Sequence, residues 1–177
     1  MLSTLKDFFT LEMIYHFTNI GVIPLWILLA FLPGWNGTKF LVNSILVPLI
    51  LGLTYFYVFY IYINTSEGIF SNILDKGKTF ELYMGIDQLK KVLSDKNVLL
   101  LFWIHFLTTN LVLGAWIATD AAKNKALQYI VLLPLVLTYF VGPIGLGVYL
   151  ILRLLAAQKL KLFDSVLVAN NLFQSYK

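Results

Sequence analysis

Apolar residues dominate four stretches of the chain, and each stretch is long enough to cross a lipid bilayer as one α-helix. The stretches are residues 11–32, 40–63, 98–119 and 127–155. A helix rises about 1.5 Å per residue, so about 22 residues reach roughly 33 Å, close to the hydrocarbon thickness of a membrane. The pattern therefore predicts four transmembrane helices. Pro24, Pro48 and the Gly142-Pro143 pair predict kinks or a break within them.

The one long connection, residues 64–97, contains a helical pattern of its own. Ile86, Leu89 and Leu93 are spaced so that they share one side of a helix, with Lys90 at its flank. We expect residues 85–94 to form a short amphipathic helix in the membrane interface. The pattern assigns no structure to residues 65–84.

Composition supports an all-α membrane protein. The chain has 177 residues, of which 59% are hydrophobic and only 12% charged, with a mean hydropathy of +0.81. Residues 1–177 are predicted to be a single four-helix transmembrane domain. The absence of cysteine excludes disulfides and thiolate metal sites. The first ten residues show no cleavage site and no transit segment, so we expect the first helix to insert the chain into a bacterial inner (plasma) membrane.

The distribution of positive charge predicts the orientation of the bundle. Four crossings would place the N-terminus, the long connection and the C-terminal tail on one side. That side would carry ten Lys and Arg residues, against three (Lys39, Lys123 and Lys125) on the other. Positive residues favour the cytoplasmic side, so both termini are predicted to be cytoplasmic. The net charge of +4 is then explained by the orientation of the helices in the membrane. We therefore expect no nucleic-acid partner.

The third apolar stretch carries more polar residues than a helix needs in order to dissolve in lipid. At about 100° per residue, two polar faces appear on opposite sides. One face holds His105, Thr109, Val112 and Trp116, and the other holds Trp103, Asn110, Gly114 and Ile117. Lipid offers polar groups no partner, so both faces are expected to meet protein, water or a ligand. This helix should therefore lie at the centre of the bundle.

Depth along the predicted helices brings several polar residues to one level in the cytoplasmic half. These residues are Glu12, His16, Asn19, Tyr57, Tyr60 and His105. Ionisable groups within a membrane are functional candidates by default, and histidine titrates near neutral pH. His105, Glu12 and His16 are therefore the candidate catalytic residues. The candidate ligand-binding residues are Asn19, Trp26, Tyr57, Tyr60, Trp103, Thr109, Asn110 and Trp116.

Each candidate also has a purely structural interpretation. Glu12 and His16 also fit the role of charged residues in the membrane interface, or of a pair of residues four apart on one helix. The tyrosines and Trp116 also fit an aromatic belt, and the two asparagines fit hydrogen bonding between helices. Two histidines without cysteine or an acidic cluster predict no metal site, and no motif predicts a cofactor.

Three stretches together resemble the membrane-protein family that includes the plant neoxanthin synthase, the abscisic-acid-deficient-four-like proteins. The first is Phe17–Pro33, FTNIGVIPLWILLAFLP. The second is Trp103–Asp120, which is similar to the family pattern W-x-H-x(4)-D-L-x-x-G-R-W-x-x-x-D. The third is Gly142–Leu150, GPIGLGVYL, which is similar to G-P-x-G-L-x-x-Y-L. The positions that carry over are Asn19, Pro24, Trp26, Trp103, His105, Gly114, Trp116, Asp120, Gly142 and Pro143.

Two departures bear on function. Asn110 replaces the aspartate of the family pattern, and Ala115 replaces its arginine. The resemblance implies chemistry on a carotenoid, in which an epoxide becomes an allene by isomerisation without net redox change. Such a reaction needs an acid and a base, with His105 as one and Glu12 or His16 as the other. An asparagine amide cannot exchange a proton usefully near neutral pH, so residue 110 is not available for this role.

Three functions remain open at this stage. The first is an enzyme, an isomerase that acts on a carotenoid epoxide or a similar isoprenoid. The second is a non-catalytic accessory or assembly subunit that binds lipid or carotenoid, either as a homo-oligomer or with a membrane-complex partner. The third and least favoured is a small transporter, because the chain has no inverted repeat and few charges within its apolar stretches. Retention of His105 favours the first, and loss of the aspartate and arginine favours the second.

Overall fold

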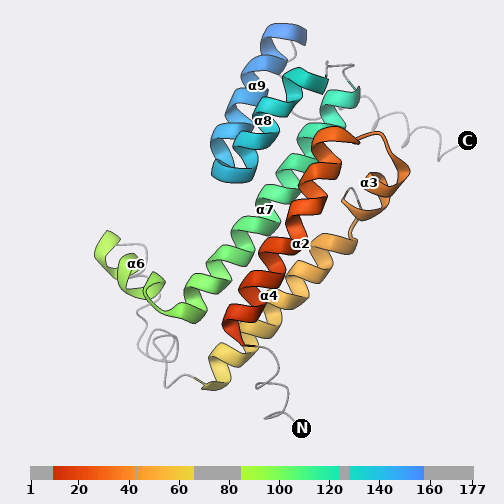
Figure 1. Cartoon of the computed structure of the whole chain (residues 1–177). Coiled ribbons are helices and arrows are strands. Elements are labelled where there is room, and N and C mark those ends of the chain that lie inside the picture. The colour runs from red at the N-terminus through yellow and green to blue at the C-terminus, as the bar shows by residue number, and fades with distance from the viewer. Residues whose placement is uncertain (1–9, 43, 66–84, 124–127, 158–177) are drawn as a thin grey trace, which may run out of the picture.

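The protein is a bundle of helices built around one long central helix (Figure 1). The computed structural model describes residues 10–42, 44–65, 85–123 and 128–157. Within them the helices are α2 (Leu11–Phe31), α3 (Asn36–Leu41), α4 (Leu46–Thr65), α6 (Ile86–Leu93), α7 (Lys96–Lys123), α8 (Gln128–Val141) and α9 (Pro143–Ala157). The predicted all-α class is confirmed.

Among the described residues, three helical segments are long and apolar enough to cross a membrane: Leu11–Phe31, Asn36–Asn64 and Lys96–Lys123. The first begins at Thr10, whose Oγ1 accepts a hydrogen bond from the Met13 N–H at 3.2 Å. It ends before Pro33, because a residue that precedes proline disfavours helical geometry. These helices make the chain an integral membrane protein, as predicted.

The second segment differs in detail from the expected helix over residues 40–63. It consists of the short α3 followed by α4, and α4 extends to Thr65. The buried Thr38 side chain donates a hydrogen bond from Oγ1 to the Leu32 carbonyl oxygen at 2.6 Å. This bond ties the start of α3 to the end of α2 and so fixes the turn between them.

The fourth stretch does not form one transmembrane helix, and that prediction is wrong. Residues 127–155 were expected to span the membrane, but the chain turns at Gly142 and separates α8 from α9. The two helices have 14 and 15 residues, so each reaches only about 21 to 23 Å, short of the roughly 30 Å hydrocarbon core. Their packing shows the direction of the turn. Gly142 lies against Asn110 halfway along α7, whereas Arg153 bonds Asp120 near its end.

Helices α8 and α9 therefore form an antiparallel hairpin that descends beside α7 and returns to the same end (Figure 1). Gly142 has a positive φ of 20°, which suits a residue without a Cβ atom at the turn. A Cβ atom on Gly145 would collide with the backbone nitrogen of Thr138, so glycine there allows the two helices to touch closely. The sequence had predicted a break at Gly142-Pro143, and the break is a reversal.

The hairpin changes where the described part of the chain ends. Helix α9 ends at the opposite end of the bundle from the start of α2 (Figure 1). Arg153 of α9 was counted with the N-terminal end, but it bonds Asp120 near the other end of α7. Moving Arg153 alone changes the charge count from ten against three to nine against four. Lys159, Lys161 and Lys177 lie outside the described residues, and the cytoplasmic location of both termini stays a prediction.

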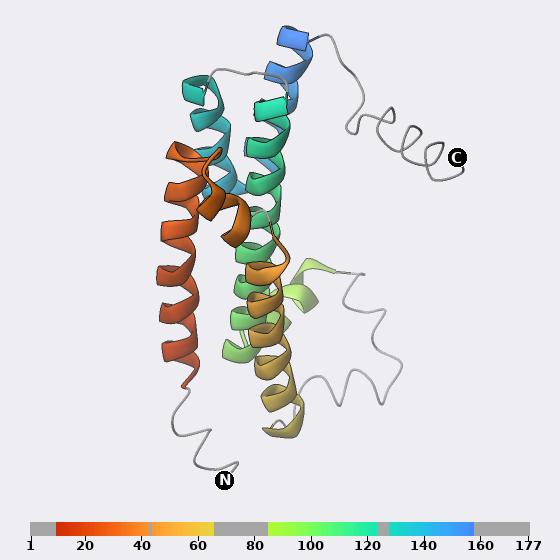
Figure 2. The ribbon, with the colours of Figure 1, turned by 90° about the vertical axis from the view of Figure 1, so that its right-hand side faces the viewer.

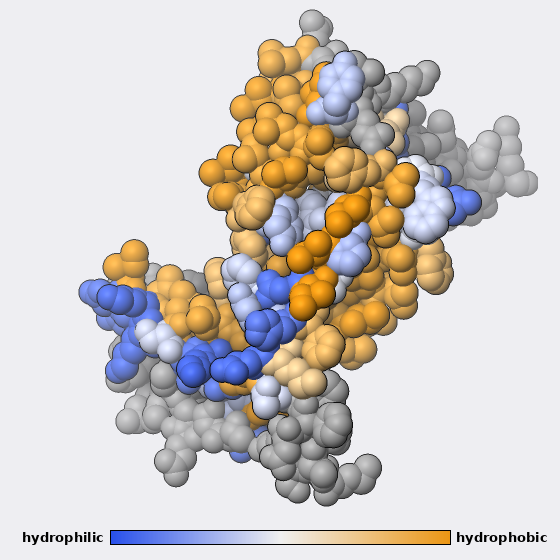
Figure 3. Space-filling view, in the orientation of Figure 1, coloured by the Kyte–Doolittle hydropathy of each residue, from blue (hydrophilic) through white to orange (hydrophobic). Residues whose placement is uncertain are grey.

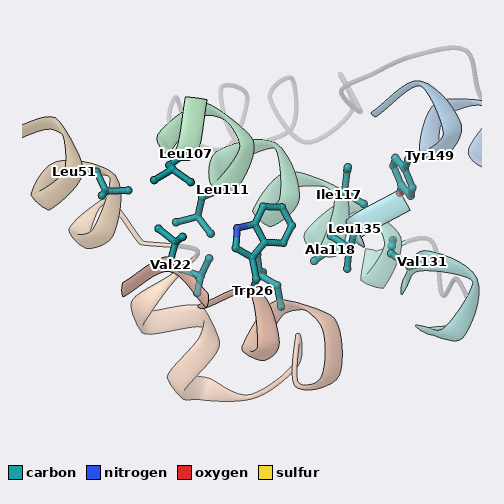
Figure 4. Packing of buried hydrophobic residues seen from close by; sticks show 13 residues of the cluster. Val22, Trp26, Leu51, Leu107, Leu111, Ile117, Ala118, Val131, Leu135 and Tyr149 are labelled. Atoms are coloured by element: carbon teal, nitrogen blue, oxygen red, sulfur yellow. The ribbon is translucent and has the colours of Figure 1, made fainter. Parts of the chain in front are cut away.

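Helix α7 is the centre of the bundle, as expected. It packs against α2, α4, α6, α8 and α9. The main hydrophobic core joins Val22 and Trp26 of α2, Leu51 of α4, and Leu107 and Leu111 of α7 (Figure 4). The predicted amphipathic helix over residues 85–94 is present as α6, and its Ile86 side chain is 82% exposed.

Candidate functional site

An apolar groove runs between α2 and α4. Figure 2 shows these two helices standing apart, with α7 behind α4. The groove has a volume of about 640 Å³ and is lined from α2 and from α4 by Ile14, Phe17, Thr18, Gly21, Val22, Leu25, Val47, Ile50, Leu51, Leu53, Thr54 and Tyr57. Small-molecule pockets commonly have volumes of about 300 to 1,000 Å³, so the groove is large enough for a ligand.

The few hydroxyl groups on the groove wall are directed mostly to their own helices. Thr18 Oγ1 donates to the Ile14 carbonyl oxygen at 2.9 Å, and Thr54 Oγ1 donates to the Ile50 carbonyl oxygen at 2.9 Å. These two hydroxyl groups are thereby satisfied within their own helices. Gly21 leaves open space, because a Cβ atom there would meet nothing within 4 Å. The groove is therefore suited to an apolar chain.

On the other side of α2, an aromatic seam joins α2 to α7. Trp103 donates a hydrogen bond from Nε1 to Asn19 Oδ1 at 3.1 Å, and Asn19 donates from Nδ2 to the Tyr15 carbonyl oxygen at 2.7 Å. The Trp103 ring stacks on Phe106 with ring centres 5.4 Å apart and lies 6.1 Å from the Tyr15 ring. Two of the predicted ligand-binding residues, Asn19 and Trp103, thus bind each other across a helix interface.

Farther along the seam, Trp26 fills the space that a side chain at position 114 would occupy. A Cβ atom on Gly114 would lie 2.6 Å from Trp26 Cη2. The indole also meets Tyr139 of α8 edge to face, with ring centres 5.5 Å apart. Trp26 is only 8% exposed, so this predicted ligand-binding residue packs three helices together.

Asn110 lies at the turn of the hairpin. Its side chain is 4% exposed and its carboxamide oxygen packs against Gly142, so closely that a Cβ atom there would overlap it. Among the described residues, Asn110 Nδ2 has no hydrogen-bond partner. Within the described part of the chain, packing alone does not explain this unsatisfied donor.

A buried ionic network holds the outer part of the hairpin to α7. Arg153 Nε lies 2.9 Å from Asp120 Oδ2, and the two side chains are 4% and 13% exposed. Tyr149 donates a hydrogen bond from its hydroxyl to the same oxygen at 2.7 Å, and its ring meets Trp116 edge to face. Opposite charges that are buried together avoid the cost of an unpaired ion.

Sequence reasoning missed two members of this network. Arg153 was counted only as a charge at the membrane surface, and Tyr149 was noted only as part of a motif. The available signal was their spacing, because residues four apart share a helix face and Arg153 lies in an otherwise apolar stretch.

The predicted catalytic residues lie on the outside of the bundle. The side chains of Glu12, His16 and His105 are all exposed, and none of them lines the groove. His16 meets the neighbouring Tyr15 ring edge to face. Of the other candidates, Tyr57 lines the groove, whereas Tyr60 is 48% exposed and Thr109 is exposed. Of the six polar residues predicted to form a pocket, Tyr57 lines this groove, and the functional roles assigned to all six stay predictions.

The two polar faces predicted for α7 have different surroundings. Trp103 is half-buried in a helix contact, and Asn110, Gly114 and Ile117 are buried. On the opposite face only Trp116 meets protein, through α9, while His105, Thr109 and Val112 are exposed. In the part of the chain that the structure describes, no group of three or more His, Cys, Asp or Glu residues is placed to hold a metal ion.

Comparison with known protein families places most of the chain in a described family. A family model described as ABA4-like (ABA DEFICIENT 4-like) covers residues 13–149. No curated protein and no solved structure matches the chain. The matched region runs from α2 through Tyr149 of α9 and so contains the groove, the aromatic seam and the turn of the hairpin.

Proposed function

Because the chain belongs to the ABA4-like family, we propose that it binds a carotenoid or a similar isoprenoid chain in the groove between α2 and α4. The apolar lining of this groove is the observation that carries the proposal. A polyene or polyprenyl chain is long, thin and without hydrogen-bonding groups along most of its length. Burial of its apolar surface stabilises such a chain in the groove. Binding then requires a matching shape and no hydrogen bonds along most of the chain.

The length of the groove agrees with this ligand class. The lining residues extend from Ile14 to Leu25 on α2 and from Val47 to Tyr57 on α4. At about 1.5 Å per residue, each wall is roughly 15 to 17 Å long. A segment of an isoprenoid chain fits along it, with the remainder directed to the lipid. The phenol of Tyr57 stands at one end, where a polar end group would lie.

The groove favours binding over isomerisation. Epoxide isomerisation needs an acid and a base within hydrogen-bonding reach of the substrate. Among the described groove residues, the only titratable side chain is Tyr57, whereas His105, Glu12 and His16 are exposed elsewhere. The alternative is an isomerase in which the ligand lies against the outer face of α7 at His105. We favour a carotenoid- or lipid-binding accessory subunit, possible partners being further copies of the chain or a larger membrane complex.

The direct test is extraction of pigment and lipid from the protein purified in mild detergent, analysed by absorption spectrum and mass spectrometry. Wild-type protein should carry a polyene or polyprenyl compound in stoichiometric amount. Gly21→Leu should lose it, because the new side chain fills open space on the groove wall. Gly52→Leu is the matched control, since Gly52 is also exposed with open space but lies outside the groove lining. Only bulk phospholipid in the wild type, or equal loss in both variants, would refute the proposal.

We also propose that the protein resides in a bacterial inner membrane, with the two ends of the described chain on opposite sides. Three crossings followed by a returning hairpin require this arrangement. Reporter domains fused before α2 and after α9 should therefore report opposite compartments. Reporters on the same side would restore a fourth crossing and contradict the hairpin.

A further inference from the structure

The turn of the α8–α9 hairpin leaves polar groups without partners at a depth where lipid supplies none. Gly142 lies at the level of Asn110, which is 14 residues into the 28-residue helix α7. The turn is therefore near the middle of the bundle and far from both ends of α7. Irregular backbone at such a depth is tolerated only where protein covers it or where it borders a polar cavity.

Three kinds of polar group gather at this turn. Asn110 Nδ2 is a buried donor that has no partner among the described residues. Helix α9 begins at Pro143, which has no N–H, so the first backbone donors without a partner among the described residues are those of Ile144 and Gly145. Helix α8 ends at Val141, and its last carbonyl oxygens are acceptors without a following helical turn. Of these oxygens, only that of Thr138 has a backbone partner within the described chain, the Gly142 N–H at 3.0 Å.

The surface near the turn is open on one side. Pro143 is exposed, Ile144 is 56% exposed and Val141 is 44% exposed. Figure 3 shows the molecule hollowed beside the hairpin, between the hairpin and α6. A ligand that approaches from the lipid along this hollow would reach the turn without passing through the groove between α2 and α4.

We propose that the hairpin turn binds the hydroxyl group of a ligand, as an uncharged polar site within the membrane. The charge pattern selects a hydroxyl over an ion. The end of α8 carries partial negative charge and the start of α9 carries partial positive charge, so a full charge of either sign is repelled by one helix as it is attracted by the other. A hydroxyl group satisfies both, because it accepts from Asn110 Nδ2 or an α9 N–H and donates to an α8 carbonyl oxygen.

The hydroxyl can belong to an amphiphilic alcohol from the lipid phase or to water, and the probe separates the two. We would measure equilibrium binding of geranylgeraniol and of the same chain ending in a methyl group, together with deuterium exchange at the Ile144 and Gly145 amides. An alcohol that occupies the site should bind on the order of tenfold more tightly than its hydrocarbon, the effect of one or two hydrogen bonds. Asn110→Leu should abolish this preference.

Two variants serve as controls. Thr108→Val should keep the preference for the alcohol, because the Thr108 hydroxyl is bonded to the Ile104 carbonyl oxygen of its own helix. Gly21→Leu should lower total binding of either chain without changing the preference, since it blocks only the groove. Failure of the proposed groove and failure of the hairpin site are therefore separate results. If Asn110→Leu does not fold, Asn110→Ala removes the same amide without adding a branched side chain.

The outcomes are distinct. A preference for the alcohol that is lost in Asn110→Leu and kept in Thr108→Val assigns the hydroxyl to an amphiphile. Equal binding of both chains, with Ile144 and Gly145 exchanging as quickly as an exposed helix end, assigns it to water. Equal binding with both amides protected like those in the middle of α9 overturns the site and leaves Asn110 as an unsatisfied packing residue.

Discussion

The two sides of α7 are packed in opposite ways. Toward the hairpin, α7 is held by close contacts at Gly142 and by an ionic network, with Asn110, Asp120, Tyr149 and Arg153 all largely buried. Toward α2 and α4 the contacts are apolar, and the two outer helices stand apart and leave a groove. On the hairpin side, Asp120, Tyr149 and Arg153 hold helices together through polar bonds, whereas on the other side an apolar surface is left open between α2 and α4.

The difference follows from what each partner helix lacks. Helices α8 and α9 are too short to span the membrane, so lipid alone does not fix their depth, and specific polar bonds have to do so. Helices α2 and α4 are long enough to be positioned by the bilayer itself. They pack against α7 through apolar residues and need no contact with each other along the groove. Variants that weaken one side should therefore leave the other largely unaffected.

The largest effect is expected from the ionic network. Arg153→Ala would leave Asp120 with its charge largely buried and its partner removed, at a cost of about 3–5 kcal/mol of unfolding free energy. Thermal unfolding in detergent, followed by circular dichroism, would measure the loss. The double variant Arg153→Met with Asp120→Leu should recover most of it, because a well-packed apolar pair replaces a buried ion pair at little cost.

Lys123→Ala is the control for this prediction, since Lys123 is an exposed cation at the end of the same helix. It should change stability by less than about 0.5 kcal/mol. If Arg153→Ala were equally mild, the network would contribute nothing to holding the hairpin, and the contrast between the two sides of α7 would lose its main support.

A smaller effect is expected from the contact between α8 and α9. Gly145→Ala would drive a methyl group into the Thr138 backbone and the Pro134 carbonyl oxygen, neither of which can move cheaply. Overpacking of this kind costs about 1–3 kcal/mol. Gly147→Ala on the same helix meets nothing within 4 Å and should be neutral or stabilise by about 0.5–1 kcal/mol, the usual gain from replacing a helical glycine. The same unfolding measurement on both variants tests the difference, and equal stability would place the two helices farther apart.

The contrast also explains what the sequence predicted well and what it did not. Length and apolarity were enough to predict α2, α4 and α7, because both properties are local to each segment and the bilayer acts on them directly. The hairpin was missed because residues 127–155 satisfy the same length criterion, and only Gly142-Pro143 marks the break. Whether a break is a kink or a reversal depends on a contact 32 positions away in the chain, between Gly142 and Asn110.

The site was harder to predict for a related reason. The predicted site was built from polar residues in apolar stretches. The structure shows instead that Asn19, Trp103 and Asp120 form polar bonds to other helices. The groove has almost no polarity to mark it. Seven of its twelve lining residues are leucine, isoleucine or valine, and the separation of α2 from α4 makes them a site. Residue type alone could not distinguish these positions from lipid-facing ones.

The smallest effect, and the sharpest test of the comparison, concerns His105. Its side chain is exposed and does not line the groove, so His105→Ala should change stability by less than about 0.5 kcal/mol. If the ligand lies between α2 and α4, the same variant should also purify with an unchanged amount of bound isoprenoid. Mass spectrometry of the extracted ligand, beside the Gly21→Leu variant, makes the comparison. Loss of ligand from His105→Ala with retention in Gly21→Leu would move the site to the outer face of α7. There an imidazole could act on the substrate, and the isomerase would then be the better hypothesis.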